Sequence, residues 1–434
     1  GDAWAEADIF ATKGGDADVK VEAKVDGTGD ANASADVTVG DDSDANVEVK
    51  AEIKKDAVNS IGDANASASV NADDGGYADV KVEAKTDGIG DATAVATVDA
   101  TKGGDADKIE VKAEVKKDGV GDADASANVT ADKGGDVDLK VEAKVDGTGN
   151  ATATADATAD KGGEVGYDGK VEVKAEVKKN GVGDAWAEAD IFATKGGDAD
   201  AKVEAKTDGE GNATAKADVT SSKGSDADVE VKAEVKNGGE GNATAISKAY
   251  ADNDSWADGD IFATVEGDGN SVAKGTAIAI DGAAALTDAT ATLGADFADN
   301  ASGTVGAESV AIAVGPNAWA NAETTATITA DSGNATNNNY AGATAIAVGP
   351  SSTATSTSSA TTDGVWAAPV SAEVIYDYDW QPMVGYAISI VYILPDGSQY
   401  AISFTYAYAG ETADADASVI NGVGTVDATV NAPA

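Results

Sequence analysis

The sequence predicts an all-β chain: a parallel β-solenoid or β-arcade with rungs of 28–34 residues, followed by a small C-terminal antiparallel β module. Three observations predict it. A Gly-Asp/Asn-Ala block recurs nine times between residues 1 and 241, at intervals that alternate between short and long. Each repeat holds a segment in which Val or Ala alternates with charged residues, which is typical of a strand with one buried face. Glycine-rich bends separate the segments.

Residues 1–241 form the first predicted region, which consists of charged β-arch repeats in four doublets of about 60 residues. Each repeat holds two predicted strands separated by a bend. The first consists of small residues, as at 30–38, and the second alternates between apolar and charged residues, as at 19–24 of the preceding repeat. The bends, for example 13–16, carry glycines that supply the positive φ angles of tight reversals. Residues 1–18 recur without change at 183–200. An identical segment at two places indicates one structural role for both.

The order of charges on the alternating strands favours parallel stacking. Lys-x-Glu-x-Lys in odd repeats alternates with Glu-x-Lys-x-Glu in even repeats, so parallel register would place each Lys beside a Glu of the next rung. An antiparallel meander would not make these strands neighbours, and a generic soluble face is the alternative explanation of the pattern. We therefore predict an inter-rung charge ladder at Lys20, Glu22, Lys24, Glu48, Lys50, Glu52, Lys81, Glu83, Lys85, Glu110, Lys112 and Glu114.

Two further regions are predicted after the charged repeats. Residues 242–365 are uncharged Ala/Thr/Asn-rich β-arch repeats, in which similar segments begin at 276, 310 and 344. Residues 366–434 are an aromatic antiparallel β module with strands at 374–378, 386–394 and 399–408 and a Pro-Asp-Gly turn at 395–397. This module is expected to cap the stack or to provide a docking face.

Composition excludes several classes of function. The chain has 77 acidic and 30 basic residues, a formal net charge of −47, and no His or Cys. It cannot build a Ser-His-Asp triad, a thiolate zinc site or a disulfide framework. The negative charge would repel nucleic acid, and the longest apolar stretch, 386–394, is too short for a membrane helix. We expect no enzyme activity and no cofactor, with incidental Ca²⁺ or Mg²⁺ binding at most. The acidic segment 252–260 lacks EF-hand spacing, which leaves metal ligands unknown.

The ends and the surface suggest partners. The chain opens with a full repeat at Gly1 and no Met, which indicates a removed leader and an amino-terminal edge open to another copy. Trp4, Trp186 and Trp256 could stack on carbohydrate, form a wider core layer or contact a neighbouring chain. Glycans on an exported protein are a hypothesis at the sequons Asn32, Asn65, Asn128, Asn150, Asn212, Asn242, Asn253, Asn300 and Asn334.

Two resemblances follow from these features. The Ala-Ile-Ala-Val-Gly-Pro units at 311–316 and 345–350 resemble head repeats of trimeric autotransporter adhesins, although the period here is more than twice as long and no coiled-coil stalk follows. The acidic tandem β-arches of about 1–365 resemble the amyloid-like sheath proteins of filamentous methanogenic archaea. That resemblance implies an extracellular, cell-surface homopolymer joined by β-stacking, without catalytic residues. A rod-like adhesin that binds a glycan or surface is the alternative.

Overall fold

A computed structural model gives the fold of the chain. It describes residues 1–12, 14–40, 43–54, 60–73, 75–133, 135–160, 164–165, 171–178, 181–194, 198–222, 226–236, 239–253, 256–280, 284–295, 303–315, 318–330, 337–348, 353–363, 372–379, 387–394, 399–407, 413–419 and 424–430. The described elements are all β-strands. They divide into two compact units, Gly1–Ser221 and Ser222–Ala434.

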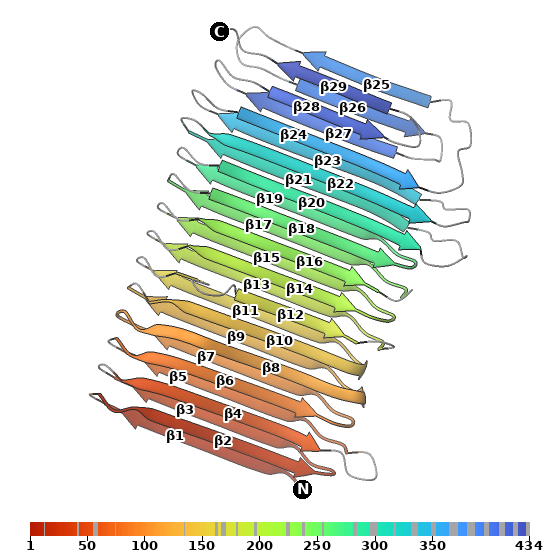
Figure 1. Ribbon diagram of the computed structural model, residues 1–434. Helices are drawn as coiled ribbons and strands as arrows, with labels where there is room; N and C mark the ends of the chain where they lie inside the picture. Colours follow the sequence, from red (N-terminus) through yellow and green to blue (C-terminus); the bar gives the residue numbers. More distant parts are fainter. Residues whose placement is uncertain are drawn as a thin grey trace. The chain divides into compact units, whose positions relative to one another are not determined.

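In the first unit the chain alternates between two sheets, here called sheet A and sheet B (Figure 1). Sheet A contains β1 (Ala3–Ala11), β3 (Ala31–Val39), β5 (Ala64–Ala72), β7 (Ala92–Ala100), β9 (Ala123–Asp132), β11 (Ala151–Asp160), β13 (Ala185–Thr194) and β15 (Ala213–Ser222). Sheet B contains β2 (Ala17–Asp26), β4 (Asp44–Lys54), β6 (Tyr77–Thr86), β8 (Asp105–Val120), β10 (Val137–Thr148), β12 (Val171–Val177) and β14 (Ala199–Thr207).

Neighbouring strands of each sheet are parallel. Ala3 of β1 lies opposite Ala31 of β3, and Ala31 lies opposite Ala64 of β5. Each rung therefore takes about 30 residues, and the predicted parallel β-solenoid is confirmed. An antiparallel meander is ruled out for these strands.

The core of each rung is built from small side chains. Along β2 every odd-numbered residue, from Ala17 to Val25, is buried and every even-numbered one is exposed. The same alternation repeats in β5 and β11. Ala and Val fill the narrow space between two sheets without voids, and each buried side chain removes apolar surface from water. This explains why a chain with only 5 Phe forms an extensive core.

The second unit continues with the same alternation. One of its sheets contains β16 (Ala227–Val235), β18 (Trp256–Glu266), β20 (Ala284–Ala295), β22 (Trp319–Ala330) and β24 (Thr353–Asp363). The other contains β17 (Ala243–Asp252), β19 (Ser271–Ile280), β21 (Gly303–Val314) and β23 (Asn337–Val348). Pairing is parallel throughout, with Ala277 opposite Ala311 and Ala311 opposite Ala345. The repeats after residue 241 therefore remain rungs of a solenoid.

The C-terminal strands divide between these two sheets. β25 (Ala372–Asp379), β26 (Ala387–Leu394) and β27 (Gln399–Ala407) are antiparallel to one another, and β27 lies parallel on β23. β28 (Ala413–Val419) lies parallel on β24, and β29 (Gly424–Val430) pairs antiparallel with β28. The antiparallel character of the module is confirmed; the predicted turn at 395–397 lies outside the described residues.

Candidate functional site

The charged residues of sheet B meet in the register that their order predicts. Lys20 lies opposite Glu48, and Glu48 lies opposite Lys81. Lys81 in turn lies opposite Glu110. The same alternation holds for the other two ladder columns through β14: Glu22, Lys50, Glu83, Lys112, Glu142, Lys174 and Glu204, and Lys24, Glu52, Lys85, Glu114, Lys144, Glu176 and Lys206.

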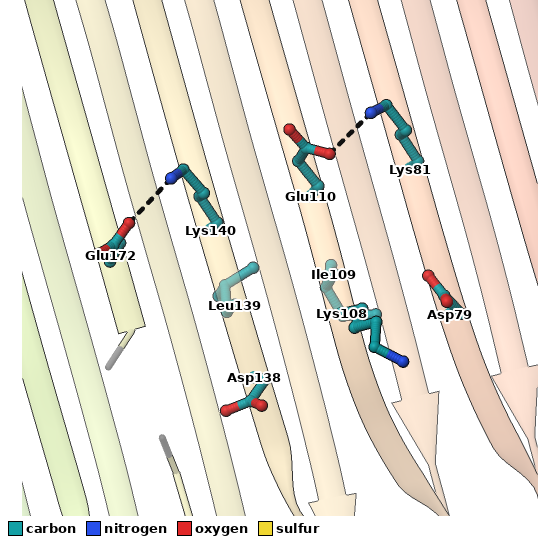
Figure 2. Close-up of a pocket in the computed structure, with 9 residues that line it drawn as sticks. All are labelled: Asp79, Lys81, Lys108, Ile109, Glu110, Asp138, Leu139, Lys140 and Glu172. Atoms are coloured by element: carbon teal, nitrogen blue, oxygen red, sulfur yellow. Dashed lines mark hydrogen bonds and ion pairs between the residues drawn. The ribbon is translucent and has the colours of Figure 1, made fainter. Parts of the chain in front are cut away.

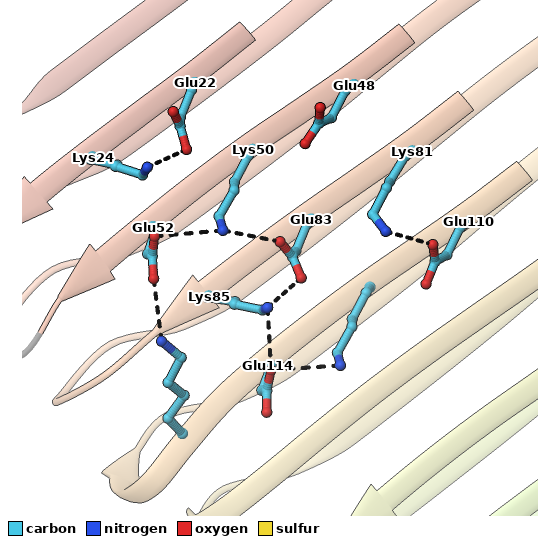
Figure 3. A network of polar contacts seen from close by, with 12 residues as sticks. Glu22, Lys24, Glu48, Lys50, Glu52, Lys81, Glu83, Lys85, Glu110 and Glu114 are labelled. Atoms are coloured by element: carbon cyan, nitrogen blue, oxygen red, sulfur yellow. Dashed lines mark hydrogen bonds and ion pairs between the residues drawn. The ribbon is translucent and has the colours of Figure 1, made fainter. Parts of the chain in front are cut away.

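Ion pairs join these residues both between and within strands (Figure 3). Between strands, Nζ of Lys20 lies 2.7 Å from Oε2 of Glu48, and Nζ of Lys81 lies 2.8 Å from Oε2 of Glu110. Within β6, Lys85 contacts Glu83. Lys116 of β8 reaches Glu52 of β4, two rungs away, at 3.3 Å. The ladder is therefore a connected network and not a set of isolated surface pairs.

The network shifts the pKa values of its central carboxylates. Burial acts to raise the pKa of Glu83, but the hydrogen bond from Lys85 and the charges of Lys85 and Lys50 outweigh burial and lower it. Lys144 and Lys112 lower the pKa of Glu142 in the same way, against the effect of burial. Both carboxylates are therefore stabilised in the charged form by the fold.

The second unit replaces this alternation with four carboxylates in one row. Glu230 lies opposite Asp260, Asp260 opposite Asp288, and Asp288 opposite Glu323. Burial, followed by the charges of Glu323 and Asp260, raises the pKa of Asp288 to about 6. Like charges on adjacent strands oppose pairing, so this row is an electrostatic weak point at neutral pH.

We expect the stability of the strands around Asp288 and that of the strands around Glu83 to respond to pH in opposite directions. The pKa of Asp288 is about 6 in the folded chain, above the unfolded value of about 3.9, so the strands around β20 gain stability as pH falls from 7 toward 4, by at most about 2 kcal/mol. The lowered pKa of Glu83 has the opposite sign: its contribution is present above about pH 4.3 and is lost as pH falls further.

Amide hydrogen exchange, corrected for intrinsic rates, measures both effects. Protection of β20 should rise between pH 7 and pH 5, and protection of β6 should fall between pH 5 and pH 3. The Asp288→Asn variant is the control, because it removes the titrating group and should abolish the rise in β20. A rise of equal size in this variant would contradict the assignment to Asp288.

A second ladder, absent from the sequence-based predictions, explains the Gly-Asp/Asn-Ala block. The side-chain oxygen of each Asp or Asn in the block accepts a hydrogen bond from the backbone N–H of the equivalent residue in the next rung: Asp63 donates to Asp30 at 3.1 Å and Asp91 to Asp63 at 3.0 Å. The series runs from Asp2 through Asp122, Asn150 and Asp184 to Asn212. The constant position of Asp or Asn after Gly was the available signal.

The preceding glycine of each block allows this close stacking. Gly149 has a φ of 148°, which side chains rarely adopt, and a Cβ atom there would overlap the carbonyl of Gly121 in the rung before. Gly121 stands in the same relation to Gly90. The approach of two backbones therefore requires glycine at this corner of the rungs from Gly29 to Gly211.

A surface cavity of about 550 Å³ lies beside an irregularity in β8 (Figure 2). The pairing of β6 with β8 shifts by one residue between Ala78 and Lys81, and Lys108 takes a φ of 53° there. Two ladder pairs border the cavity, Lys81 with Glu110 and Lys140 with Glu172, the latter at 3.0 Å. These charged groups are already engaged with one another. Among the described residues, no group of three or more acidic side chains is placed to hold a metal ion.

Several predicted sequons belong to the Asp/Asn ladder. Asn150 Oδ1 accepts from the N–H of Asp184, and Asn212 Nδ2 donates to Asp184 Oδ1 at 3.0 Å. Asn270 donates to Asn242 in the same manner. Asn65 and Asn128 are exposed on outward faces of strands, Asn65 donates to Asn32, and Asn253 is exposed with a φ of 64°. Asn300 and Asn334 lie outside the described residues.

Trp4, Trp186 and Trp256 lie on outer faces of the sheets, so the prediction that they form a wider core layer is wrong. Trp4 is 78% exposed and Trp256 is 43% exposed. Trp186 contacts the ammonium group of Lys216, which lies 4.1 Å from its ring centre. Trp256 and Trp319 form an edge-to-face pair with centroids 6.4 Å apart. Successive side chains of a strand point to opposite faces. The residue after each of these Trp points inward, so the Trp side chain points outward.

The first rung forms one end of its sheets. Among the described strands, β1 pairs with β3 and β2 pairs with β4, and each has one edge without a neighbouring strand. β13 has the same sequence as β1, yet it lies between two strands, with Ala185 opposite Ala151 of β11. Phe10 of β1 is 74% exposed, whereas the equivalent Phe192 of β13 is 43% exposed. A segment that stacks on both sides in one place therefore has one unstacked side in the other.

Comparison with known protein families, with characterised proteins and with solved structures gives no match to this chain. None of the described residues belongs to a helix that could cross a lipid bilayer.

Proposed function

We propose that this chain is an extracellular structural protein, without enzymatic activity, that assembles with copies of itself by edge-to-edge β-stacking into a sheath, tube or filament around cells. The observation that carries the proposal is the shared sequence of β1 and β13. In β13 both edges of this sequence are hydrogen-bonded to neighbouring strands, while β1 has one edge without a neighbour among the described strands. A regular parallel edge with small side chains is a template for strand addition.

The surface of the rungs suits an extended assembly. Most outward side chains of the first unit are charged or polar and most inward ones are Ala or Val, and opposite charges meet in the parallel register. The stack can therefore be lengthened without changing its cross-section. The resemblance of the repeats to archaeal sheath proteins agrees with this function, and glycans on exposed sequons would agree with an extracellular location.

Sedimentation and chemical resistance test the proposal. Purified chain should form polymers whose mass grows with concentration and which resist sodium dodecyl sulfate and proteases. Antibodies against the chain should label the outside of intact source cells. A chain that sediments as a monomer at all concentrations, and that proteases degrade readily, would refute self-assembly.

The exposed pair Trp256–Trp319 favours a second candidate, a rod-like adhesin that binds a glycan. Trp319 is 40% exposed, and indole faces stack on sugar rings. A glycan array distinguishes the two functions: the adhesin requires monomeric chain to bind a sugar, and Trp256→Ala should abolish that binding. The sheath function requires no such binding.

A further inference from the structure

Among the described strands, β1 and β2 each have one edge without a neighbouring strand, and the backbone groups at these edges follow a defined pattern. The N–H of Ala3 donates to Asp30 and the carbonyl of Ala11 accepts from Gly40, so the odd-numbered residues of β1 direct their backbone groups toward β3. Directly after β2, the N–H of the odd-numbered Gly27 donates to Lys54 of β4 in the same direction. Since backbone groups alternate along a strand, the even-numbered residues of both strands direct theirs at the unpaired edge.

We propose that a second copy of this chain occupies this edge head to head. β1 pairs antiparallel with β1 of the second copy and β2 pairs antiparallel with its β2, around one two-fold axis perpendicular to the sheets. This joint rests on the proposed self-assembly and specifies its geometry at the amino-terminal end. An isologous contact of this kind needs a surface that is complementary to itself.

The charges of β2 are self-complementary in the antiparallel direction. With the axis at Val21, Lys20 lies opposite Glu22 of the second copy, and Asp18 lies opposite Lys24. Each contact occurs twice by symmetry. All four residues are even-numbered, so their outward backbone groups also meet as hydrogen-bonded pairs. Moving the register by two residues would place Lys20 opposite Lys24, which repulsion disfavours.

The aromatic residues of β1 select the same axis. β1 runs from Ala3 to Ala11, and its midpoint is Ala7. Pairing the whole strand about Ala7 places Trp4 opposite Phe10 of the second copy, again twice. Trp4 and Phe10 are the two most exposed large hydrophobic side chains of the described residues. Cross-strand aromatic pairs stabilise antiparallel sheets, and the joint would cover both rings.

The opposite end of the chain is a poorer occupant for this edge. β25, the outermost strand of its sheet, carries Glu373, Asp377 and Asp379 and no lysine. β1 carries Glu6 and Asp8 and also no lysine. The charged residues that a pairing of β25 with β1 brings together would therefore all be acidic. The head-to-head joint has one kind of acidic contact, Glu6 opposite Asp8, which occurs twice by symmetry. Stacked carboxylates are already present within the chain, where Asp8 lies opposite Asp36.

Single cysteines test the joint, because the natural chain contains none. A residue on the axis lies opposite the same residue of the second copy. Opposed residues of a non-hydrogen-bonded antiparallel pair have Cα atoms about 4.5 Å apart, which is within the range of a disulfide bond. Val21→Cys and Ala7→Cys should each form a disulfide-linked dimer on mild oxidation. The matched controls are Val25→Cys and Ala3→Cys, whose two copies would lie about 26 Å apart across the joint. We expect at least tenfold more dimer from the axis variants.

The outcomes separate this joint from self-assembly in general. Polymers in sedimentation without a disulfide at Val21→Cys or Ala7→Cys would overturn the head-to-head joint and leave self-assembly standing. Disulfide-linked dimers that do not grow further would support the joint and refute the polymer. A chain that remains monomeric refutes both. Because Ala7→Cys and Val21→Cys lie on different strands, misfolding of one variant leaves the other to decide.

Discussion

Reversing the three ladder charges of β6, in the variant Lys81→Glu/Glu83→Lys/Lys85→Glu, should lower the free energy of unfolding of the first unit by on the order of 3 kcal/mol. β6 lies between β4 and β8, so the reversal converts six attractive contacts into repulsive ones. Cross-strand charge pairs contribute about 0.2–1 kcal/mol each, and like charges oppose pairing by similar amounts. The loss should be measured by denaturant unfolding.

Two matched variants separate repulsion from lost attraction. The neutral variant Lys81→Gln/Glu83→Gln/Lys85→Gln removes the same pairs without adding repulsion, and it should lose about half as much stability. Reversing the ladder charges of β2 and β4 as well as those of β6 should recover about half of the loss, because only the three contacts between β6 and β8 then remain repulsive. Equal stability of the reversed and original chains would contradict the role assigned to the ladder.

Gly149→Ala should be the most damaging single substitution in the Gly-Asp/Asn-Ala blocks. Alanine would have to adopt a φ of 148°, and its Cβ would overlap the carbonyl of Gly121. Backbone strain of about 1–3 kcal/mol adds to the cost of separating two rungs, so we expect a loss on the order of 3 kcal/mol. Hydrogen exchange should show the loss of protection centred on β9 and β11.

Gly40→Ala is the control for this substitution. Gly40 follows β3, does not have a positive φ, and the nearest atom to a new Cβ is the Ala11 carbonyl oxygen at 3.9 Å. Its effect should be within about 0.5 kcal/mol. If Gly149→Ala were equally harmless, the corner would not require glycine and the close stacking at this position would need another explanation.

The charge order was sufficient to predict the register. Lys20, Glu48 and Lys81 occupy equivalent places in consecutive repeats and have alternating sign, so parallel stacking of consecutive repeats in register brings opposite charges together. The face of each strand was also predictable, because Val21 and Glu22 follow the period of two that a half-buried strand requires. Long repetition made these signals strong.

Other features depended on geometry that the sequence does not display directly. The block Gly-Asp/Asn-Ala was recognised as a marker of period, but its function depends on backbone approach between rungs, as at Gly121 and Gly149. The irregularity at Lys108 arises from one extra residue, which shifts the register of β8 against both β6 and β10. The sequence also does not show which C-terminal strand pairs with β23. β25 and β27 are both aromatic, alternating strands, but β27 pairs with β23 and β25 pairs with β26.

Cryo-electron microscopy of the purified, assembled chain tests the central claim most directly. The account predicts that, where two molecules meet, β1 and β2 are hydrogen-bonded to strands of another copy, so that the strand spacing of about 4.8 Å continues through the joint. If assembled particles instead show β1 and β2 facing solvent in every molecule, with contacts made only through outer faces of the sheets, the unpaired edge is not an assembly surface and the account is wrong.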